Sequence, residues 1–209
     1  MPLASPIHPG QVVWTGENPG ILLKEDPDGP FSAIALFFRI YLSPAGRGTV
    51  LLLLDSPEQR RQYPDGCNVL LHDNKGLADY LLDSFILKLP AFAALPACES
   101  LSLIGIDESY PEGDPRSCYS EIVKAGSLDI RLTWDGLGTP TALELPAELT
   151  GGKENELYTL LIESTKPAIQ VNGRQLPGNP VERVQADICL LYTSTSPRDK
   201  RQSRMPSSA

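Results

Sequence analysis

The stretch from Ser32 to Leu54, SAIALFFRIYLSPAGRGTVLLLL, decides the fold. Its first half, Ser32 to Leu42, alternates between two sets of side chains, and this period of two is that of a β-strand. Ser43-Pro44-Ala45-Gly46 then supplies the residues of a turn. The second half, Thr49 to Leu54, is apolar on both faces, as in a strand that is covered from two sides. We therefore predict a hairpin near the centre of a sheet.

Downstream of this hairpin, one segment has the pattern of a helix. The sequence LADYLLDSFILKL, residues 77–89, is apolar over most of its circumference. Asp73 or Asn74 is a natural N-cap before it, and Pro90 is expected to end it. A helix with so wide an apolar arc is covered by other elements, most simply by a curved sheet.

Further strands are predicted on both sides of this helix. Asn172-Gly173 is the strongest two-residue hairpin signal in the chain, although Pro177 and Pro180 make its second arm short or irregular. If the strands that flank the helix pair in parallel, the crossover between them should be right-handed. Period-two patterns and turn residues place the remaining strands at 67–71, 101–106, 119–123, 128–134, 141–145, 157–163 and 168–171.

Together these patterns predict an α+β domain with about nine strands, predominantly antiparallel, and one helix. The preferred arrangement is a curved sheet or barrel around the single apolar helix. The alternative is a two-sheet β-sandwich with the helix across one end. Residues 1–187 have the size of a single globular domain.

The chain changes composition after Asp187. Residues 188–209, ICLLYTSTSPRDKRQSRMPSSA, are rich in Ser, Pro and basic residues, with Asp199 as their single carboxylate. The run LLYTSTSPRDKRQSRMPSSA resembles translated sequencing-adapter read-through, which occurs at the ends of unrelated reading frames. This resemblance implies a domain over residues 1–187 that is truncated at its C-terminus, followed by a non-native, disordered tail at 188–209.

Composition and charge exclude several classes of function. The formal net charge is -8, and 41% of the residues are hydrophobic, which is typical of a globular protein. Because an acidic surface repels phosphate, we expect no nucleic-acid partner. No apolar run reaches the roughly 18 residues of a membrane helix, and the first residues lack the pattern of a signal peptide. We therefore predict a cytoplasmic protein with no membrane partner.

No motif indicates a metal or a cofactor. Nucleotide-binding, zinc-protease and serine-hydrolase motifs are absent, so we expect no cofactor. Gly46 and Gly48 precede a strand rather than a helix, which favours a turn over a phosphate-binding loop. The cysteines and histidines lack metal-ligand spacing, and no metal site is predicted at Cys67, Cys98, Cys118, Cys189, His8 or His72.

His72 and Asp107 are the candidate catalytic residues. His72 follows a predicted strand just before the helix, where a histidine could act as a general base or bind an anion. Asp107 follows the strand after the helix, and the pair would suit a small hydrolase or isomerase. The simpler interpretation is that His72 ends a strand beside Asp73, which caps the helix. The acidic stretch 107–114 is expected to be a solvated loop, because its spacing does not match a calcium-binding EF-hand.

Phe37, Tyr41 and Trp134 are the candidate ligand-binding residues. All three fall on predicted strands, and Tyr41 and Trp134 have polar tips that need partners. The leading prediction is a non-catalytic binding module, in which these strands and the apolar helix line a pocket or groove for an apolar small molecule or a protein partner. The simpler interpretation places these aromatic residues in the core. A structural subunit is a third possibility, which would expose an apolar patch.

Overall fold

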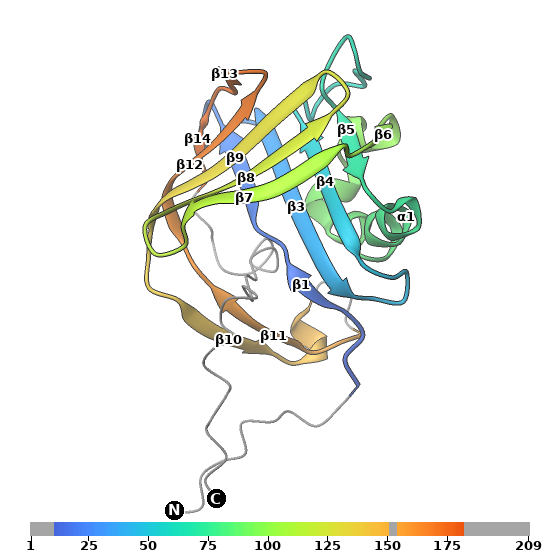
Figure 1. The fold of residues 1–209 in the computed structure, drawn as a ribbon, viewed down its shortest axis with the longest axis vertical. Coiled ribbons are helices and arrows are strands. Elements are labelled where there is room, and N and C mark those ends of the chain that lie inside the picture. The colour runs from blue at the N-terminus through green and yellow to red at the C-terminus, as the bar shows by residue number, and fades with distance from the viewer. Residues whose placement is uncertain (1–10, 151–153, 182–209) are drawn as a thin grey trace, which may run out of the picture.

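The computed structural model describes residues 11–150 and 154–181. The predicted C-terminal truncation and the predicted tail at 188–209 lie outside the described residues. Within them, two β-sheets face each other and a layer of short helices covers the outer face of the larger sheet (Figure 1). The termini of the described chain lie close to the edge of the larger sheet that β1 and β2 form.

The larger sheet, sheet A, has seven strands in the order β14-β2-β3-β4-β5-β6, and β1 pairs with the far end of β3. All neighbours are antiparallel except β5 and β6, which are parallel. The predicted hairpin forms its centre as β3 and β4. The strands are β1 (Thr15–Glu17), β2 (Gly20–Lys24), β3 (Ala33–Leu42), β4 (Gly48–Leu54), β5 (Val69–His72), β6 (Ser102–Gly105) and β14 (Asn179–Pro180).

The second sheet, sheet B, has five antiparallel strands in the order β13-β12-β9-β8-β7. They are β7 (Glu108–Asp114), β8 (Cys118–Ala125), β9 (Leu128–Leu137), β12 (Ser164–Val171) and β13 (Arg174–Gln175). The predicted turn at Asn172-Gly173 joins β12 to β13, and both residues have the positive φ that a two-residue hairpin loop requires. Between β9 and β12 the chain forms a separate two-stranded sheet, β10 (Thr141–Leu145) and β11 (Leu157–Leu161), which we call the arm.

The helical layer lies between β5 and β6 in the chain. It consists of α1 (Lys75–Ser84), η1 (Ile86–Lys88), α2 (Pro90–Ala93) and η2 (Pro96–Glu99). A further short helix, η3 (Ala147–Leu149), follows β10 in the arm. The helices pack on the face of sheet A that sheet B leaves uncovered.

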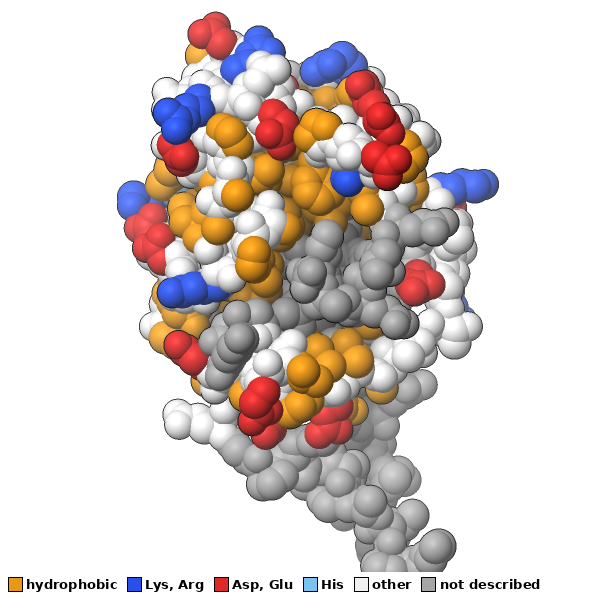
Figure 2. All heavy atoms as spheres, turned by 180° about the vertical axis from the view of Figure 1, so that it is seen from behind, with side chains coloured by type: hydrophobic (Ala, Val, Ile, Leu, Met, Phe, Trp, Pro, Cys, Tyr) orange, Lys and Arg blue, Asp and Glu red, His pale blue; other side chains and the backbone are white. Residues whose placement is uncertain are grey.

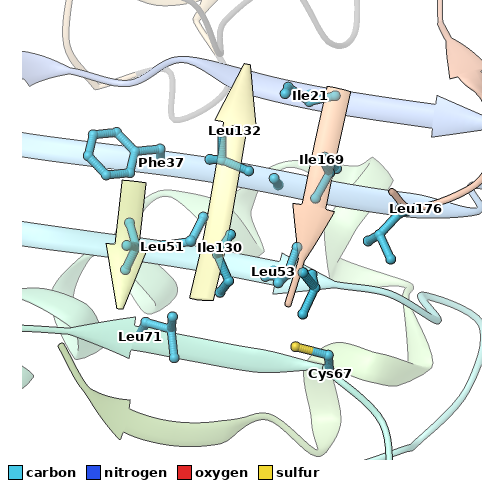
Figure 3. Packing of buried hydrophobic residues seen from close by; sticks show 14 of the residues in the cluster. Ile21, Phe37, Leu51, Leu53, Cys67, Leu71, Ile130, Leu132, Ile169 and Leu176 are labelled. Carbon is cyan, nitrogen blue, oxygen red and sulfur yellow. The ribbon is translucent and has the colours of Figure 1, made fainter. Parts of the chain in front are cut away.

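Sheet A therefore has a hydrophobic core on each face, as the pattern of β4 predicts. Val50, Leu52 and Leu54 belong to the core beneath the helices, whereas Leu51 and Leu53 belong to the core between the sheets (Figure 3). All five are fully buried. Since burial of one such side chain contributes about 1.5–3 kcal/mol, this strand is a main source of stability.

The prediction of a mostly antiparallel β protein with few helices is confirmed, but the barrel around a helix is corrected. The described strands form separate sheets that do not close, and α1 lies outside sheet A. The physical reason is the two-sided burial of β3 and β4. A barrel offers one interior, whereas two apolar faces need two covering layers. The arrangement is nearer to the alternative sandwich, with the helices over one face instead of across one end.

The predicted helix is shorter than its sequence pattern. α1 ends at Ser84, Phe85 leaves the helical region with φ -132° and ψ -64°, and Pro90 begins α2 instead of ending a helix. The apolar side chains of residues 77–89 lie around most of the helix circumference, so a straight helix over this range would expose some of them. By turning at Phe85, the chain buries Ile86, Leu89 and Phe92 against the same face of sheet A.

The acidic stretch 107–114 is a strand for most of its length, which corrects the predicted solvated loop. β7 pairs with β8 along its whole length and forms one edge of sheet B in the described structure. An edge strand tolerates Pro111 and several charges, because one side of it needs no partner strand. Ion pairs from Lys124 to Glu108 and from Arg131 to Glu112, both at 2.8 Å, reduce the repulsion between its carboxylates.

Candidate functional site

A charged cluster lies between the two sheets near the end of β3. The Arg39 guanidinium donates two parallel hydrogen bonds to Glu121 on β8, from Nη1 to Oε1 and from Nη2 to Oε2, each 2.7 Å long. Arg39 Nη1 also lies 3.4 Å from Glu17 Oε2 on β1. Such a two-point pair is the strongest geometry of an arginine with a carboxylate. We call Glu17, Arg39, Tyr119 and Glu121 the inter-sheet cluster.

Alternation along the strands places these charges inside the molecule. Phe37, Arg39 and Tyr41 point from β3 toward sheet B, and Glu121 points back from β8 with a side chain that is 0% exposed. A carboxylate in such a place must be paired, because burial of a lone charge costs several kcal/mol. Burial alone would lower the pKa of Arg39, but the hydrogen bonds and the charge of Glu121 raise it above its ordinary value. Arg39 is therefore positively charged.

Tyr119 in the cluster and Tyr41 beside it stay protonated. The Tyr119 hydroxyl donates to Glu121 Oε1. Burial, followed by the charge of Glu121, raises the pKa of Tyr119 above its ordinary range. Burial and the charge of Glu17 raise the pKa of Tyr41 to about 12. Both phenols are hydrogen-bond donors at neutral pH, and neither is set up to act as a base.

The three predicted ligand-binding residues surround this cluster. The Arg39 guanidinium lies 5.1 Å from the ring centre of Phe37, and the Tyr119 and Trp134 ring centres are 6.0 Å apart. Phe37 is 0% exposed, and Trp134, whose Nε1 donates to the Gly20 carbonyl at 3.2 Å, is 5% exposed. Tyr41 is 41% exposed. Phe37 and Trp134 are thus core residues, and α1 lies on the other face of sheet A from all three.

The structure does not bring the side chains of His72 and Asp107 together. Their backbones are close, since the His72 carbonyl accepts a hydrogen bond from Ile106 N at 2.8 Å. By alternation, however, the His72 side chain shares the helix-side face of β5 with Leu70. The Asp107 carboxylate instead accepts a hydrogen bond from Gly126 N, at 2.7 Å, in the turn of sheet B. A catalytic role of this pair stays a prediction for which this geometry gives no support.

The described part of the chain also holds no arranged site for a metal ion or for a reactive cysteine thiol. No group of three or more His, Cys, Asp or Glu side chains there could hold a metal ion. Burial, aided by the charge of Asp55, raises the pKa of the Cys67 thiol to about 12. Burial likewise raises that of Cys98 to about 11. Both thiols are protonated at neutral pH and are poor nucleophiles.

An exposed apolar surface lies beside the cluster. β3 extends beyond β4, since the last pair between them is Ile40 with Gly48. Beyond that pair, Tyr41 is 41% exposed and Leu42 is 49% exposed. Thr15 pairs with Leu42, and Val12 and Val13, which are separated from Thr15 by Trp14, are 60% and 37% exposed. We call Val12, Val13, Tyr41 and Leu42 the strand-end surface.

Sequence reasoning did not identify Glu17, Arg39, Tyr119 or Glu121 as site residues. A signal was present, since alternation places Arg39 on the same face as Phe37. A charge at an inward position of a central strand calls for a buried partner. The identity of that partner depended on the contact between two sheets that lie far apart in the sequence.

In comparisons with protein-family models, with curated proteins and with solved structures, none matches this chain. Among the described helices, none is both long and apolar enough to span a membrane.

Proposed function

We propose that the protein is a non-catalytic binding module that recognises a protein partner through the strand-end surface. One observation carries the proposal. The apolar residues of β3 from Ala33 to Ile40 are at most 2% exposed, whereas the next two, Tyr41 and Leu42, are about half exposed at the end of the same strand. Because consecutive side chains of a strand point to opposite faces, Tyr41 and Leu42 expose apolar surface on both sides of the strand end, and exposed apolar surface is typical of interaction sites.

The cluster beneath this surface supports the proposal, because it fixes the position of Tyr41. The Tyr41 phenol interacts with Glu17, which in turn contacts Arg39 and thereby the buried Glu121. A tyrosine that is already ordered loses little conformational entropy on binding. Such aromatic residues dominate the energetics of many protein interfaces.

The charge of the cluster indicates the chemistry of the partner. Two carboxylates, Glu17 and Glu121, face one guanidinium, Arg39, so the cluster carries a formal charge of one negative unit. The whole chain carries a formal net charge of -8. Long-range attraction therefore favours a partner that presents an apolar side chain flanked by lysine or arginine.

Site-specific photo-cross-linking in cells that express the protein tests this proposal. A photoreactive amino acid replaces Leu42 in one variant and the exposed Glu58, which precedes the helical layer, in a control variant. We expect a cross-linked protein partner from position 42 that is absent from position 58. The same cross-links from both positions, or none from position 42, would overturn the proposal.

Matched substitutions then measure the contribution of the surface. Leu42→Asp and Leu103→Asp change leucines of similar exposure, 49% and 45%, on different strands of sheet A. With the purified partner, Leu42→Asp should weaken binding by about tenfold or more, because it places a charge in an apolar interface. Leu103→Asp should leave the Kd unchanged. If the two variants behave alike, the strand-end surface is not the binding site.

A further inference from the structure

The arm presents a leucine-rich face to the helical side of sheet A. Residues that pair directly in the β10–β11 ladder share a face, so Leu143, Leu145, Leu157, Thr159 and Leu161 all point the same way. Leu145, Leu157 and Leu161 pack against the core beneath the helices, as do Trp14 and Phe31. The arm thus covers part of that core with its apolar face.

Thr159, at the centre of this face, is polar where its neighbours are leucines. It lies opposite Leu143, with Leu157 and Leu161 two residues away on either side. The residue is 1% exposed, and its hydroxyl Oγ1 has no hydrogen-bond partner among residues 11–150 and 154–181. A buried hydroxyl without a partner destabilises a fold, so its presence needs a physical explanation.

The arm is attached to the rest of the molecule mainly by side-chain contacts. In the described structure, β10 and β11 form their ladder with each other and belong to neither sheet A nor sheet B. A hydrogen bond of 2.8 Å from Gly138 N to the Glu163 carbonyl closes the base of the arm. A two-stranded hairpin has little stability of its own. Displacement of the arm therefore breaks few backbone hydrogen bonds.

We propose that the arm and the helix-side core bind a neutral, apolar small molecule with one hydrogen-bonding group, and that this group pairs with the Thr159 hydroxyl. The arm moves outward to admit the molecule and closes over it. The ligand would bury its apolar part among the leucines and provide the hydrogen-bond partner that the Thr159 hydroxyl lacks among the described residues. This site lies on the opposite face of sheet A from the inter-sheet cluster and is independent of the proposed protein-binding surface.

The charges of the arm favour a neutral ligand. The inward face carries no ionisable side chain, and burial of a charge there would cost several kcal/mol. On its other side and at its ends, the arm carries exposed glutamates, which repel a carboxylate ligand. Seen from behind, the lower part of the molecule, where the arm lies, shows hydrophobic side chains flanked by acidic ones (Figure 2). The exposed glutamates are Glu144, Glu148, Glu154 and Glu156.

Titration calorimetry of the full-length protein with 1-decanol and with decanoate tests the proposal. The two probes have the same chain length, but only decanoate is charged at neutral pH. We expect 1-decanol to bind and decanoate to bind at least about tenfold more weakly. Equal affinity for the two probes, or no binding of 1-decanol, would overturn the proposal.

The isosteric variant Thr159→Val separates binding from folding. Loss of the hydroxyl should weaken 1-decanol binding about three- to tenfold, which is the effect of one hydrogen bond. In the absence of ligand the same change should raise the Tm by roughly two to four degrees, because it removes an unsatisfied buried group. Thr139→Val makes the same chemical change at an exposed position that precedes β10 and should alter neither quantity.

Hydrogen exchange tests the movement of the arm. Amides of β10 and β11 should exchange faster than those of β4, and 1-decanol should slow their exchange while leaving that of β7 unchanged. If Thr159→Val lowers the Tm and leaves the affinity for 1-decanol unchanged, the hydroxyl has a structural role and the proposal is wrong. Slow exchange of the arm without ligand would equally contradict it.

Discussion

At the scale of single residues, the pair of Arg39 with Glu121 has the greatest effect on the space between the sheets. Each side chain is tolerated inside the molecule because the other is there. Removal of one partner leaves a buried charge without compensation, which is more damaging than the loss of one contact.

Glu121→Gln should therefore lower the free energy of unfolding by about 3–5 kcal/mol. The double variant Arg39→Met with Glu121→Leu should lose less, since it removes both charges of the two-point pair and leaves only Glu17, whose contact with Arg39 is the longer one at 3.4 Å. Arg60→Met, which breaks the exposed ion pair with Glu99, is the control and should cost no more than about 1 kcal/mol. Urea denaturation of the four proteins measures these differences. A double variant as unstable as Glu121→Gln would contradict the explanation.

The raised pKa values of the tyrosines make stability depend on alkaline pH. In the unfolded chain a tyrosine loses its proton near pH 10, whereas in the folded protein Tyr41 keeps it to about pH 12 and Tyr119 to still higher pH. The folded state thus binds more protons than the unfolded state above pH 10, and stability falls as pH rises through this range.

Tyr119→Phe should reduce that fall. The variant lacks one of the two groups, so the slope of the free energy of unfolding between pH 10 and 11 should decrease by up to about 1.4 kcal/mol per pH unit. Denaturation at a series of pH values measures the slope. An unchanged slope would mean that the phenol already ionises in the folded protein.

What the sequence predicts at this scale is the direction of a side chain, not its partner. The period of two shows that Phe37 and Trp134 point inward, and both are buried. It could not show that Arg39 meets Glu121, which lies 82 residues away in another sheet. It also could not show that Asp107 faces Gly126 and not His72, because the turn between β8 and β9 approaches β6 only after the two sheets have packed.

At the scale of elements, the start of α1 is specified more sharply than its end. The sequence offers Asp73 or Asn74 as the cap, and the structure selects Asn74, whose Oδ1 accepts a hydrogen bond from Leu77 N at 3.2 Å. The Asn74 amide also donates to the carbonyls of Ala45 and Arg47 in the β3–β4 turn. Asp73 accepts from Thr49 N at 2.7 Å. Both residues tie the helix to the central hairpin.

Asn74→Ala should lower the free energy of unfolding by about 2 kcal/mol, about half from the lost cap and half from the lost bonds to the turn. Asp79→Ala, on the solvent side of the same helix, removes an exposed ion pair with Lys75 and should cost about 0.5 kcal/mol or less. Thermal or urea denaturation compares the two variants. Equal losses would indicate that Asn74 acts only through helix propensity.

Periodicity predicts the long elements and misses the short ones. β3 and β9 have enough alternating residues to show a period of two, β4 is a continuous apolar run, and these three strands and β8 lie close to their predicted positions. β1 has three residues and β14 has two, which is too few for a pattern. β7 carries proline and glycine among its carboxylates, and only pairing with β8 makes it a strand. The end of α1 depends on burial of Phe85 beside Trp14 and Phe38.

At the scale of the whole molecule, the two cores share one sheet. The sequence predicts this sharing, because β4 is apolar on both faces. It does not predict which layer covers which face, since the same pattern suits a sheet wrapped around a helix. That choice depends on long-range packing of β7, β8, β9 and β12, which no local signal describes.

Because sheet A belongs to both cores, the cores should unfold together. Ile34→Val in the helix-side core and Ile130→Val in the core between the sheets should each cost about 0.5–1.5 kcal/mol. Their effects should add to within about 0.5 kcal/mol, because the two side chains share no contacts across the sheet. Circular dichroism and tryptophan fluorescence should report one transition. Two separate transitions would show that sheet B unfolds independently.

The pairing of β2 has a consequence for synthesis on the ribosome. It pairs on one side with β3, which follows it directly, but on the other side with β14 at Asn179–Pro180. The Ser32 hydroxyl likewise cannot donate to its acceptor, the Pro177 carbonyl, until residue 177 has been synthesised. While the nascent chain is being made, the growing sheet therefore exposes an apolar strand with an open edge until nearly all the described residues have been translated. During that interval it is a natural substrate for chaperones that bind extended hydrophobic segments.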